Sequence, residues 1–222
     1  MANEGEVSTV NGETAILIDG ATGKILFEKN SDRLMYPASI TKILTGIVAI
    51  EEGNIDDVVT VSENARNIDG TRVYLLEGEQ VPLLKLIQGL LINSGNDAAT
   101  AIAEHMDGSE SAFADRMNTF AEDKIGVKNS IFRNPHGLFD SEHRTTAFDM
   151  AMITRYAMQN EVFREVVGTK QMEWKGEGWE TTLYNHNKLL WRYKGATGVK
   201  NGFVDESGYT VVASAKRGNT EL

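Results

Sequence analysis

Strand-like segments lie at both ends of this chain, and helix-like segments fill its middle. Near the N-terminus, residues 14–19 and 24–29 are rich in apolar residues and are separated by Gly20-Ala21-Thr22-Gly23, which predicts a hairpin. Near the C-terminus, residues 197–204 and 209–216 show a similar pattern around a short turn. A sheet built from both ends of a chain leaves the middle as an insertion. We therefore predict an α+β fold, in which an antiparallel sheet is flanked by helices.

The middle of the chain has the spacing of apolar residues that is typical of helices. Helices are predicted over residues 82–91, 96–106, 109–124 and 146–158, after a helix that begins near Ser39, with one short strand at 58–61. Thr146 reads as a helix cap, and Gly108 as a helix end. We expect one domain over residues 1–222, with a sheet part from about 11–45 and 195–222 and a mostly helical part from about 46–194.

The composition excludes several classes of protein. Hydrophobic residues make up 41% of the 222 positions, which is enough for a sizeable core. The net charge of −10 argues against nucleic acid or anionic lipid as the main partner. No stretch approaches the length of a membrane span, and residues 1–6 lack the basic and apolar regions of a signal peptide. The protein is then either cytosolic or a secreted protein whose signal has been removed.

The segment Tyr36-Pro37-Ala38-Ser39-Ile40-Thr41-Lys42 carries the first chemical signal. A serine hydroxyl is a poor nucleophile unless a base lies beside it. Lys42 follows Ser39 by three residues, which places the amine on the same helix face, one turn along. The apolar residues that follow can bury the pair, and burial favours the neutral amine that a base must be. The alternative is a helix start, with Ser39 as the N-cap and Lys42 in solvent.

Two further motifs follow in order along the chain. The first is Ser94-Gly95-Asn96, and the second is Lys200-Asn201-Gly202 near the C-terminus. Their order and type match the Ser-x-x-Lys, Ser-x-Asn and Lys-Thr-Gly set of penicillin-binding proteins and class A β-lactamases. The three motifs together favour the catalytic interpretation of Ser39 over the helix cap.

The resemblance extends over nearly the whole chain. The segments 37–42 and 93–99 resemble those of the serine D-alanyl-D-alanine carboxypeptidases, the low-molecular-mass penicillin-binding proteins that trim peptidoglycan stem peptides. Segments 134–138, 146–151 and 185–190 resemble further parts of the same family. The resemblance implies a β-lactamase/transpeptidase-like fold and no cofactor. It also implies a stem peptide ending in D-Ala-D-Ala as substrate, β-lactams as covalent inhibitors, and work outside the cytoplasm after removal of a signal peptide. Any membrane contact would then come from a segment not in this chain.

The resemblance also implies a role for each motif residue. Ser39 would be the acylated nucleophile and Lys42 its base, while Ser94 would pass a proton to the leaving amine and Asn96 would steady the lysine. On the edge strand, Lys200 and Asn201 would meet the substrate carboxylate, and Gly202 would let the peptide approach closely. The backbone N–H groups of Ser39 and Phe203 would form the oxyanion hole.

The sequence departs from the family pattern at two places. Asn201 stands where the family usually has threonine, so we expect weaker recognition of the substrate carboxylate. The chain ends at Leu222, whereas the family fold continues into at least one more strand and a C-terminal helix. We expect these elements to be absent, and the strand at 209–216 to have an open edge.

Two alternative functions remain open at this point. A β-lactamase of class A would need a glutamate for deacylation, and no Glu-x-x-Leu-Asn segment is present. A non-catalytic peptidoglycan-binding relative would keep the fold without the chemistry. The four histidines, His105, His136, His143 and His186, lack metal-ligand spacing, so we expect no metal site. His136 is interpreted as structural.

Overall fold

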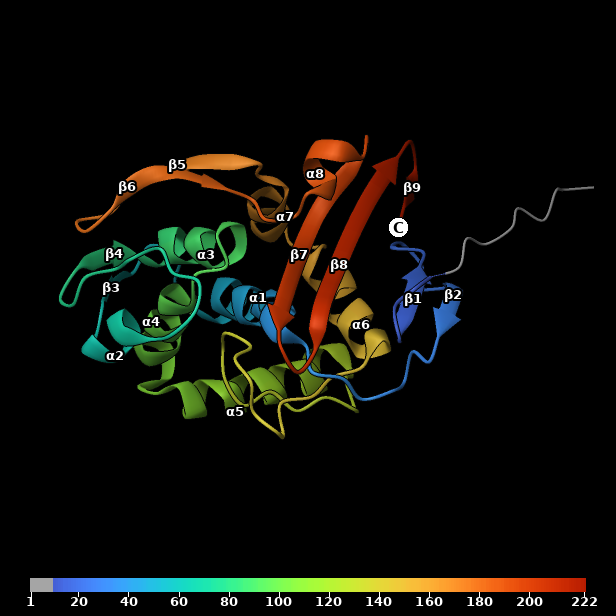
Figure 1. The fold of residues 1–222 in the computed structure, drawn as a ribbon, viewed down its shortest axis with the longest axis horizontal. Helices are drawn as coiled ribbons and strands as arrows, with labels where there is room; N and C mark the ends of the chain where they lie inside the picture. Colours follow the sequence, from blue (N-terminus) through green and yellow to red (C-terminus); the bar gives the residue numbers. More distant parts are fainter. Residues whose placement is uncertain (1–9) are drawn as a thin grey trace, which may run out of the picture.

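A computed structural model describes residues 10–222 (Figure 1). Its elements, with η marking a 3-10 or π turn, are β1 (Ala15–Ile18), β2 (Ile25–Lys29), η1 (Ala38–Thr41), α1 (Lys42–Glu52), β3 (Val58–Thr60), α2 (Glu63–Asn67), β4 (Gln80–Pro82), α3 (Leu83–Ile92), α4 (Asn96–Asp107), α5 (Glu110–Phe120), η2 (Ala121–Ile125), α6 (Ala147–Ala157), α7 (Glu161–Gly168), β5 (Gln171–Lys175), β6 (Glu180–Tyr184), α8 (Leu189–Arg192), β7 (Ala196–Val204), β8 (Gly208–Arg217) and β9 (Thr220–Glu221). The predicted α+β class is confirmed. The signal-peptide interpretation concerns residues 1–6, which lie outside the described residues.

The two ends of the chain meet as predicted, but they do not form one continuous ladder. Strands β7, β8 and β9 form a three-stranded antiparallel sheet in that order, and β1 pairs only with β2. The backbone N–H of Gly20 donates to the carbonyl of Glu221 at 2.8 Å and links the hairpin to β9. Strand β9 is two residues long and pairs with β8 at Lys216 and Arg217, and Leu222 continues the pairing at Ala215. The open edge expected for β8 is therefore closed at that end.

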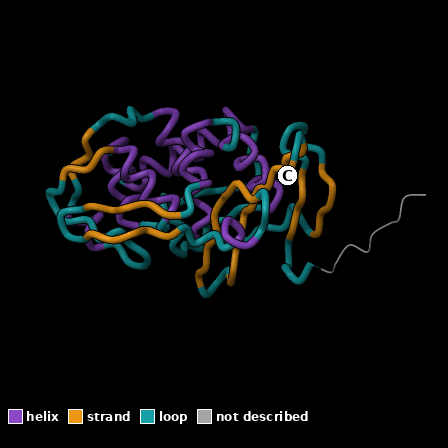
Figure 2. Tube along the Cα trace, turned by 90° about the horizontal axis from the view of Figure 1, so that it is seen from above, coloured by secondary structure: helices purple, strands orange, loops and turns teal. Residues whose placement is uncertain are grey.

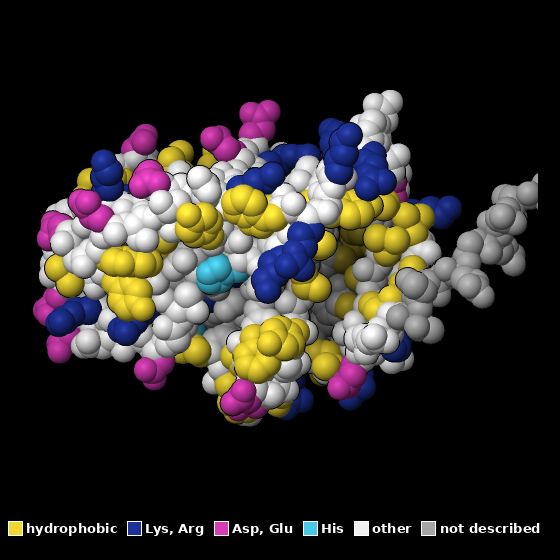
Figure 3. All heavy atoms as spheres, turned by 45° about the horizontal axis from the view of Figure 1, so that its top comes forward, with side chains coloured by type: hydrophobic (Ala, Val, Ile, Leu, Met, Phe, Trp, Pro, Cys, Tyr) yellow, Lys and Arg dark blue, Asp and Glu magenta, His cyan; other side chains and the backbone are white. Residues whose placement is uncertain are grey.

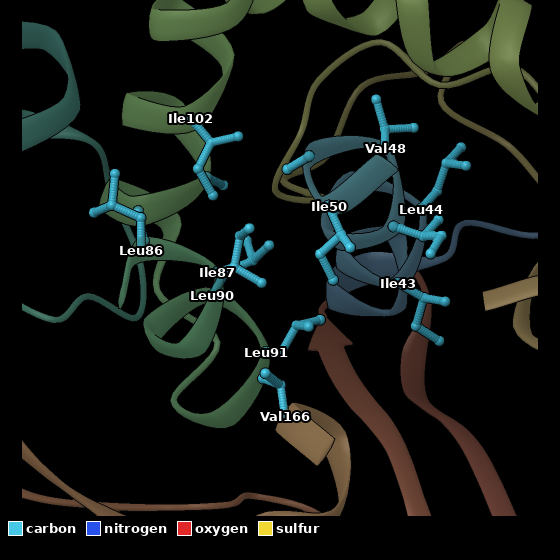
Figure 4. Packing of buried hydrophobic residues seen from close by; sticks show 14 of the residues in the cluster. Ile43, Leu44, Val48, Ile50, Leu86, Ile87, Leu90, Leu91, Ile102 and Val166 are labelled. Atoms are coloured by element: carbon cyan, nitrogen blue, oxygen red, sulfur yellow. The ribbon is translucent and has the colours of Figure 1, made fainter. Parts of the chain in front are cut away.

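Helix α1 forms the centre of the core and packs against β7 and five of the surrounding helices, α3, α4, α5, α6 and α7. Every residue from Lys42 to Ile50 is buried, as expected for a helix that is apolar on all sides. Figure 4 shows Ile43, Leu44, Val48 and Ile50 of α1 with Leu86, Ile87, Leu90 and Leu91 of α3. Burying each such side chain contributes roughly 1.5–3 kcal/mol. This packing fixes the start of α1, where Lys42 lies.

The helices of the middle region begin and end close to the predicted positions. The side chain of Thr146 accepts a hydrogen bond from the Asp149 N–H at the start of α6, and Gly108 ends α4 with a φ of 76°. Figure 2 shows the helices gathered in one group, with strands along its margins. No helix within residues 10–222 combines the length and the apolar character needed to cross a bilayer.

The middle region holds more strand than the sequence predicted. Strand β3 pairs with β4, and β5 pairs with β6, both antiparallel. The β5–β6 hairpin is anchored by Trp174, which is fully buried. A Cβ added at Gly89 of α3 would lie 3.1 Å from the indole ring, so the ring rests directly on the helix backbone. Helices are its commonest element and strand β3 was predicted, but β4, the β5–β6 hairpin and the helices α2, α7 and α8 were missed.

Candidate active site

Ser39 lies in the tight turn η1, one residue after a strained backbone position. Ala38 has a φ of 52°, in the left-handed region that residues other than glycine rarely adopt. The turn has no side-chain cap, so Ser39 is not the helix cap of the alternative interpretation. Ser39 is half-buried, whereas Ala38 and Ile40 on either side are buried. The turn therefore holds the serine at the surface of a rigid core.

Lys42 is the first residue of α1 and is completely buried. Its Nζ lies 3.0 Å from Ser39 Oγ, 2.8 Å from Asn96 Oδ1 and 2.6 Å from the carbonyl oxygen of His136. The amide oxygen and the carbonyl oxygen can only accept hydrogen bonds, whereas the serine hydroxyl can donate. A neutral amine has two N–H groups for the first two, and its lone pair is then left for the Ser39 hydroxyl.

The surroundings of Lys42 favour this neutral form. Burial lowers the pKa of Lys42 well below its usual value, and the positive charge of Lys200 lowers it further. The carboxylate of Asp97 opposes this effect but is the smallest of the three contributions. Asp97 itself is held in place by the backbone N–H groups of Val73 and Leu75, at 3.0 and 3.1 Å. The surroundings of Lys42 therefore favour an amine that can accept a proton from the serine beside it.

Both acceptors of the lysine are themselves fixed. Asn96 begins α4, and its Nδ2 donates to the carbonyl of Asp69 at 2.7 Å, so its Oδ1 faces the lysine. The carbonyl of His136 belongs to the loop 134–138, whose Gly137 has a φ of 85°. A Cβ at Gly137 would lie 1.9 Å from the carbonyl oxygen of Ala38, so only glycine lets this loop rest on the serine turn.

His136 has a second contact that the sequence did not reveal. Its Nδ1 accepts a hydrogen bond from the Leu138 N–H at 3.1 Å, and its Nε2 lies 3.3 Å from Glu110 Oε1. Burial lowers the pKa of His136, and the contact with Glu110 opposes this effect. The structural interpretation of the ring fits these contacts. The carbonyl, however, touches Lys42, and the only signal for it was the resemblance of segment 134–138 to the family.

Ser94 lies in the turn between α3 and α4, two residues before Asn96. It is buried and has a φ of 64°, a strained conformation for serine. The hydrogen bonds found within residues 10–222 include none from its hydroxyl to Ser39 or Lys42. The turn is held by the Gly95 N–H, which donates to the Gly89 carbonyl at 3.1 Å. Strain of this kind concentrates at functional positions, which supports the interpretation made from the sequence.

Strand β7 brings the third motif against the serine turn. A Cβ at Gly202 would lie 2.6 Å from the backbone nitrogen of Ser39, so the strand and the turn are in direct contact. Lys200 is 2% exposed, and its Nζ donates only to the carbonyl of Asn201, at 2.9 Å. Burial lowers the pKa of Lys200 to about 7. Phe203 is 51% exposed beside Tyr209, with ring centroids 4.8 Å apart.

The structure therefore joins some of the predicted residues and leaves others apart. Ser39, Lys42 and Asn96 form one hydrogen-bonded group, and Gly202 abuts it through the backbone. Asn201 is half-buried opposite Val211, and its side chain takes part in no hydrogen bond among the described residues. Burial lowers the pKa of His186, and the positive charges of Lys200 and Lys42 add to this effect.

The family model of the D-alanyl-D-alanine carboxypeptidases, peptidase family S11, matches residues 1–222. The chain belongs to this family. It is 38% identical over 214 residues to the D-alanyl-D-alanine carboxypeptidase DacF of Bacillus subtilis, covering 93% of this chain and 54% of that protein. It is 36% identical to DacA of Escherichia coli K12, covering 97% and 56%. The chain thus spans about half the length of these curated carboxypeptidases.

Solved structures of related enzymes confirm the predicted transpeptidase-like fold. The Streptomyces K15 DD-transpeptidase is 30% identical, with a TM-score of 0.89, and the match covers 96% of this chain and 88% of that one. The carboxypeptidase DacD from Francisella tularensis has the same identity and TM-score, with 96% and 64% covered. The family resemblance stated from the sequence is confirmed.

Proposed function

We propose that this protein is a serine D-alanyl-D-alanine carboxypeptidase, which removes the terminal D-alanine from peptidoglycan stem peptides through an acyl-enzyme on Ser39. The observation that carries the proposal is the buried Lys42, whose Nζ lies 3.0 Å from Ser39 Oγ while its other two partners can only accept hydrogen bonds. This arrangement supplies a nucleophile together with an amine whose pKa is lowered by burial, as a base for that nucleophile requires.

Acylation begins with transfer of the Ser39 hydroxyl proton to the lone pair of Lys42. The serine oxygen attacks the carbonyl carbon of the penultimate D-alanine, and the carbonyl oxygen becomes an oxyanion. The backbone N–H groups of Ser39 and Phe203 stabilise it, and such donors commonly contribute about 3–4 kcal/mol to lowering the barrier. The C–N bond then breaks, and the amine of the leaving D-alanine takes a proton through Ser94, which recovers it from Lys42.

In deacylation, water attacks the acyl-enzyme and Ser39 becomes the leaving group. Lys42 takes a proton from the water, and the hydroxide attacks the ester carbonyl at the same oxyanion site. The proton returns to Ser39 as the ester bond breaks. The shortened peptide leaves with a new carboxylate, and the enzyme is restored.

The substrate lies along the free edge of β7 as an added strand. Strand β7 is the edge strand of its sheet, so its outward backbone groups are open for pairing with an extended peptide. The terminal carboxylate of the peptide is met by Lys200 and Asn201. Because stem peptides are assembled into the wall outside the cell, the protein works extracytoplasmically, and β-lactams inhibit it by acylating Ser39.

One alternative has a specific observation in its favour. The Streptomyces K15 relative is described as a DD-transpeptidase, and this chain covers 88% of it. A transpeptidase forms the same acyl-enzyme but passes the acyl group to an amine. The fate of the acyl group therefore distinguishes the two activities.

The test is release of D-alanine from diacetyl-Lys-D-Ala-D-Ala, with and without glycine as an amine acceptor. A carboxypeptidase releases D-alanine and the dipeptide diacetyl-Lys-D-Ala at a similar rate in both conditions, and the matched variant Ser39→Ala releases neither. A glycine adduct as the main product would assign transpeptidation instead. Absence of any D-alanine release by the parent would contradict the proposal and favour a non-catalytic relative, whereas rapid turnover of benzylpenicillin would indicate a β-lactamase.

A further inference from the structure

Six exposed cationic side chains gather around α8, and this group is called the α8 surface below. They are Lys170, Lys188, Arg192, Lys194, Lys216 and Arg217. None of them takes part in an ion pair among residues 10–222. Two hydrogen bonds hold the end of β8 beside the segment that follows α8. The Lys216 N–H donates to the Gly195 carbonyl at 2.8 Å, and the Arg217 side chain donates through Nε to the Lys194 carbonyl at 3.3 Å.

The stretch of chain around α8 carries no carboxylate of its own. Residues 181–204 contain no aspartate or glutamate. Glu221 lies opposite Lys216 in the sheet, but its carboxylate is bound to Arg164 at 2.8 Å. Figure 3 shows several dark blue side chains on the upper part of the molecule. A cationic surface on a protein of net charge −10 attracts an anionic partner to one place, while the rest of the molecule repels it.

Aromatic rings lie among these cations. Tyr184 is 56% exposed, Trp191 48% and Tyr193 47%. The ammonium of Lys170 lies 5.6 Å from the centroid of the Trp191 ring, and the guanidinium of Arg217 lies 4.6 Å from that of Tyr193. Each ring is thus held in place beside a cation and still presents part of its surface to a ligand. Such rings stack on the apolar faces of sugars, and the neighbouring cations pair with carboxylates.

The α8 surface begins at the rim of the active site. The loop that contains His186 leads directly into α8, and β7 with Lys200 follows it. Helix α8 packs against β7, and β7 packs against the serine turn η1. A ligand on the α8 surface can therefore extend along β7 to the turn that holds Ser39.

We propose that the α8 surface binds the polymeric form of the substrate, a glycan strand whose stem peptides carry free carboxylates. This rests on the proposed function, which supplies a substrate that is both saccharide and anionic. A lipid surface fits less well, because α8 is only four residues long and Leu189 is its one exposed aliphatic residue, with Leu190 buried. Rings and cations in alternation match a strand on which sugars and carboxylates alternate.

The test measures cosedimentation of the protein with purified cell-wall sacculi from which phosphate polymers have been removed. The variant Arg192→Glu/Lys194→Glu reverses two charges of the surface, and Lys124→Glu/Lys128→Glu reverses two exposed charges elsewhere as the matched control. Trp191→Ala removes one ring. Each protein is also assayed on the short peptide diacetyl-Lys-D-Ala-D-Ala, and each melting curve is recorded to show that the variant is folded.

The parent and the control variant are expected to bind sacculi equally. The affinity of the surface variant for sacculi should be lower by about ten-fold or more, since clustered charge changes the association rate of a charged ligand by roughly 10–10³-fold. High salt should screen the charge contribution, and the remaining binding should be lost in Trp191→Ala. All variants should hydrolyse the short peptide as the parent does.

Sacculus binding that is unchanged in the surface variant would overturn the proposal. Binding that is unchanged in Trp191→Ala would also overturn it. Binding only to anionic vesicles, or only to sacculi that retain phosphate polymers, would assign the surface to another polyanion. Failure of the parent to hydrolyse the short peptide would instead count against the proposed function. The two failures are thus read from different assays.

Discussion

Gly202→Ala tests whether the contact between β7 and the serine turn positions the catalytic group. The new Cβ would lie 2.6 Å from the Ser39 nitrogen and 2.8 Å from Thr210 Oγ1. The threonine cannot easily turn away, because its hydroxyl donates to the carbonyl of Pro37 at 2.9 Å. The turn cannot retreat either, because Ile40 and Lys42 are packed in the core. The strand must therefore move away from the turn by about 0.4 Å or more, since real Cβ contacts are not shorter than 3.0 Å.

This shift acts on the chemistry more than on the fold. It separates the N–H groups of Ser39 and Phe203, which form the proposed oxyanion hole. Displacements of up to 1 Å cost as much as about 10²-fold in rate, whereas overpacking costs roughly 1–3 kcal/mol of stability. We expect the rate of acylation by fluorescent penicillin to fall by about 10-fold to 10²-fold. The protein should remain folded under the conditions of the assay.

Stopped-time labelling with fluorescent penicillin measures the acylation rate, and circular dichroism measures the melting temperature. Gly168→Ala is the matched control, because its Cβ would meet only the carbonyl oxygen of Thr197, at 3.2 Å, at the end of α7. The control should acylate like the parent. An acylation rate for Gly202→Ala within three-fold or so of the parent would refute the argument that this contact sets the geometry of the site.

Three further changes test single residues of the site. Lys42→Ala should slow acylation by about 10²–10⁴-fold with unchanged far-ultraviolet circular dichroism, and a rate close to that of the parent would mean that another base acts. Lys200 is charged in both the folded and the unfolded state below its folded pKa of about 7, so its burial is most costly there. As pH rises from 7 towards 10, the folded state loses this proton before the unfolded state does. Stability should therefore rise by up to about 1.4 kcal/mol per pH unit relative to Lys200→Met, as measured by urea unfolding, and parallel curves would contradict this pKa. Asn201→Thr should raise turnover of D-Ala-D-Ala peptides by about 10-fold or more, because a hydrogen bond to a charged group is worth roughly 1.5–3 kcal/mol; unchanged or lower turnover would show that Asn201 serves equally well.

The parts of the fold predicted correctly are those with local signals. Thr146 caps α6 and Gly108 ends α4, because a cap and a left-handed turn depend on one or two residues. The β5–β6 hairpin was missed because Glu173 and Lys175 surround a single buried ring, Trp174, which is held by a distant helix. Its stability comes from tertiary packing, which the local pattern does not display.

In the candidate site, too, the contacts with a local signal were predicted and those without one were not. The spacing of Ser39 and Lys42 predicts their contact, because three residues along a helix bring side chains together. The carbonyl of His136 could not be predicted as a partner of Lys42, because a backbone group leaves no mark in the choice of side chain. The left-handed φ of Ser94, in the turn between the packed helices α3 and α4, likewise has no signal in the sequence, because serine rarely adopts it.

Mass spectrometry after reaction with benzylpenicillin tests the central claim most directly. The claim is that Ser39 is the residue that carries the acyl group, because Lys42 lies 3.0 Å from its hydroxyl and burial lowers the pKa of this lysine. Digestion of the adduct should show one penicilloyl group, on the peptide that contains Ser39, and none in Ser39→Ala. An adduct on another peptide, or one that persists in Ser39→Ala, would contradict the account.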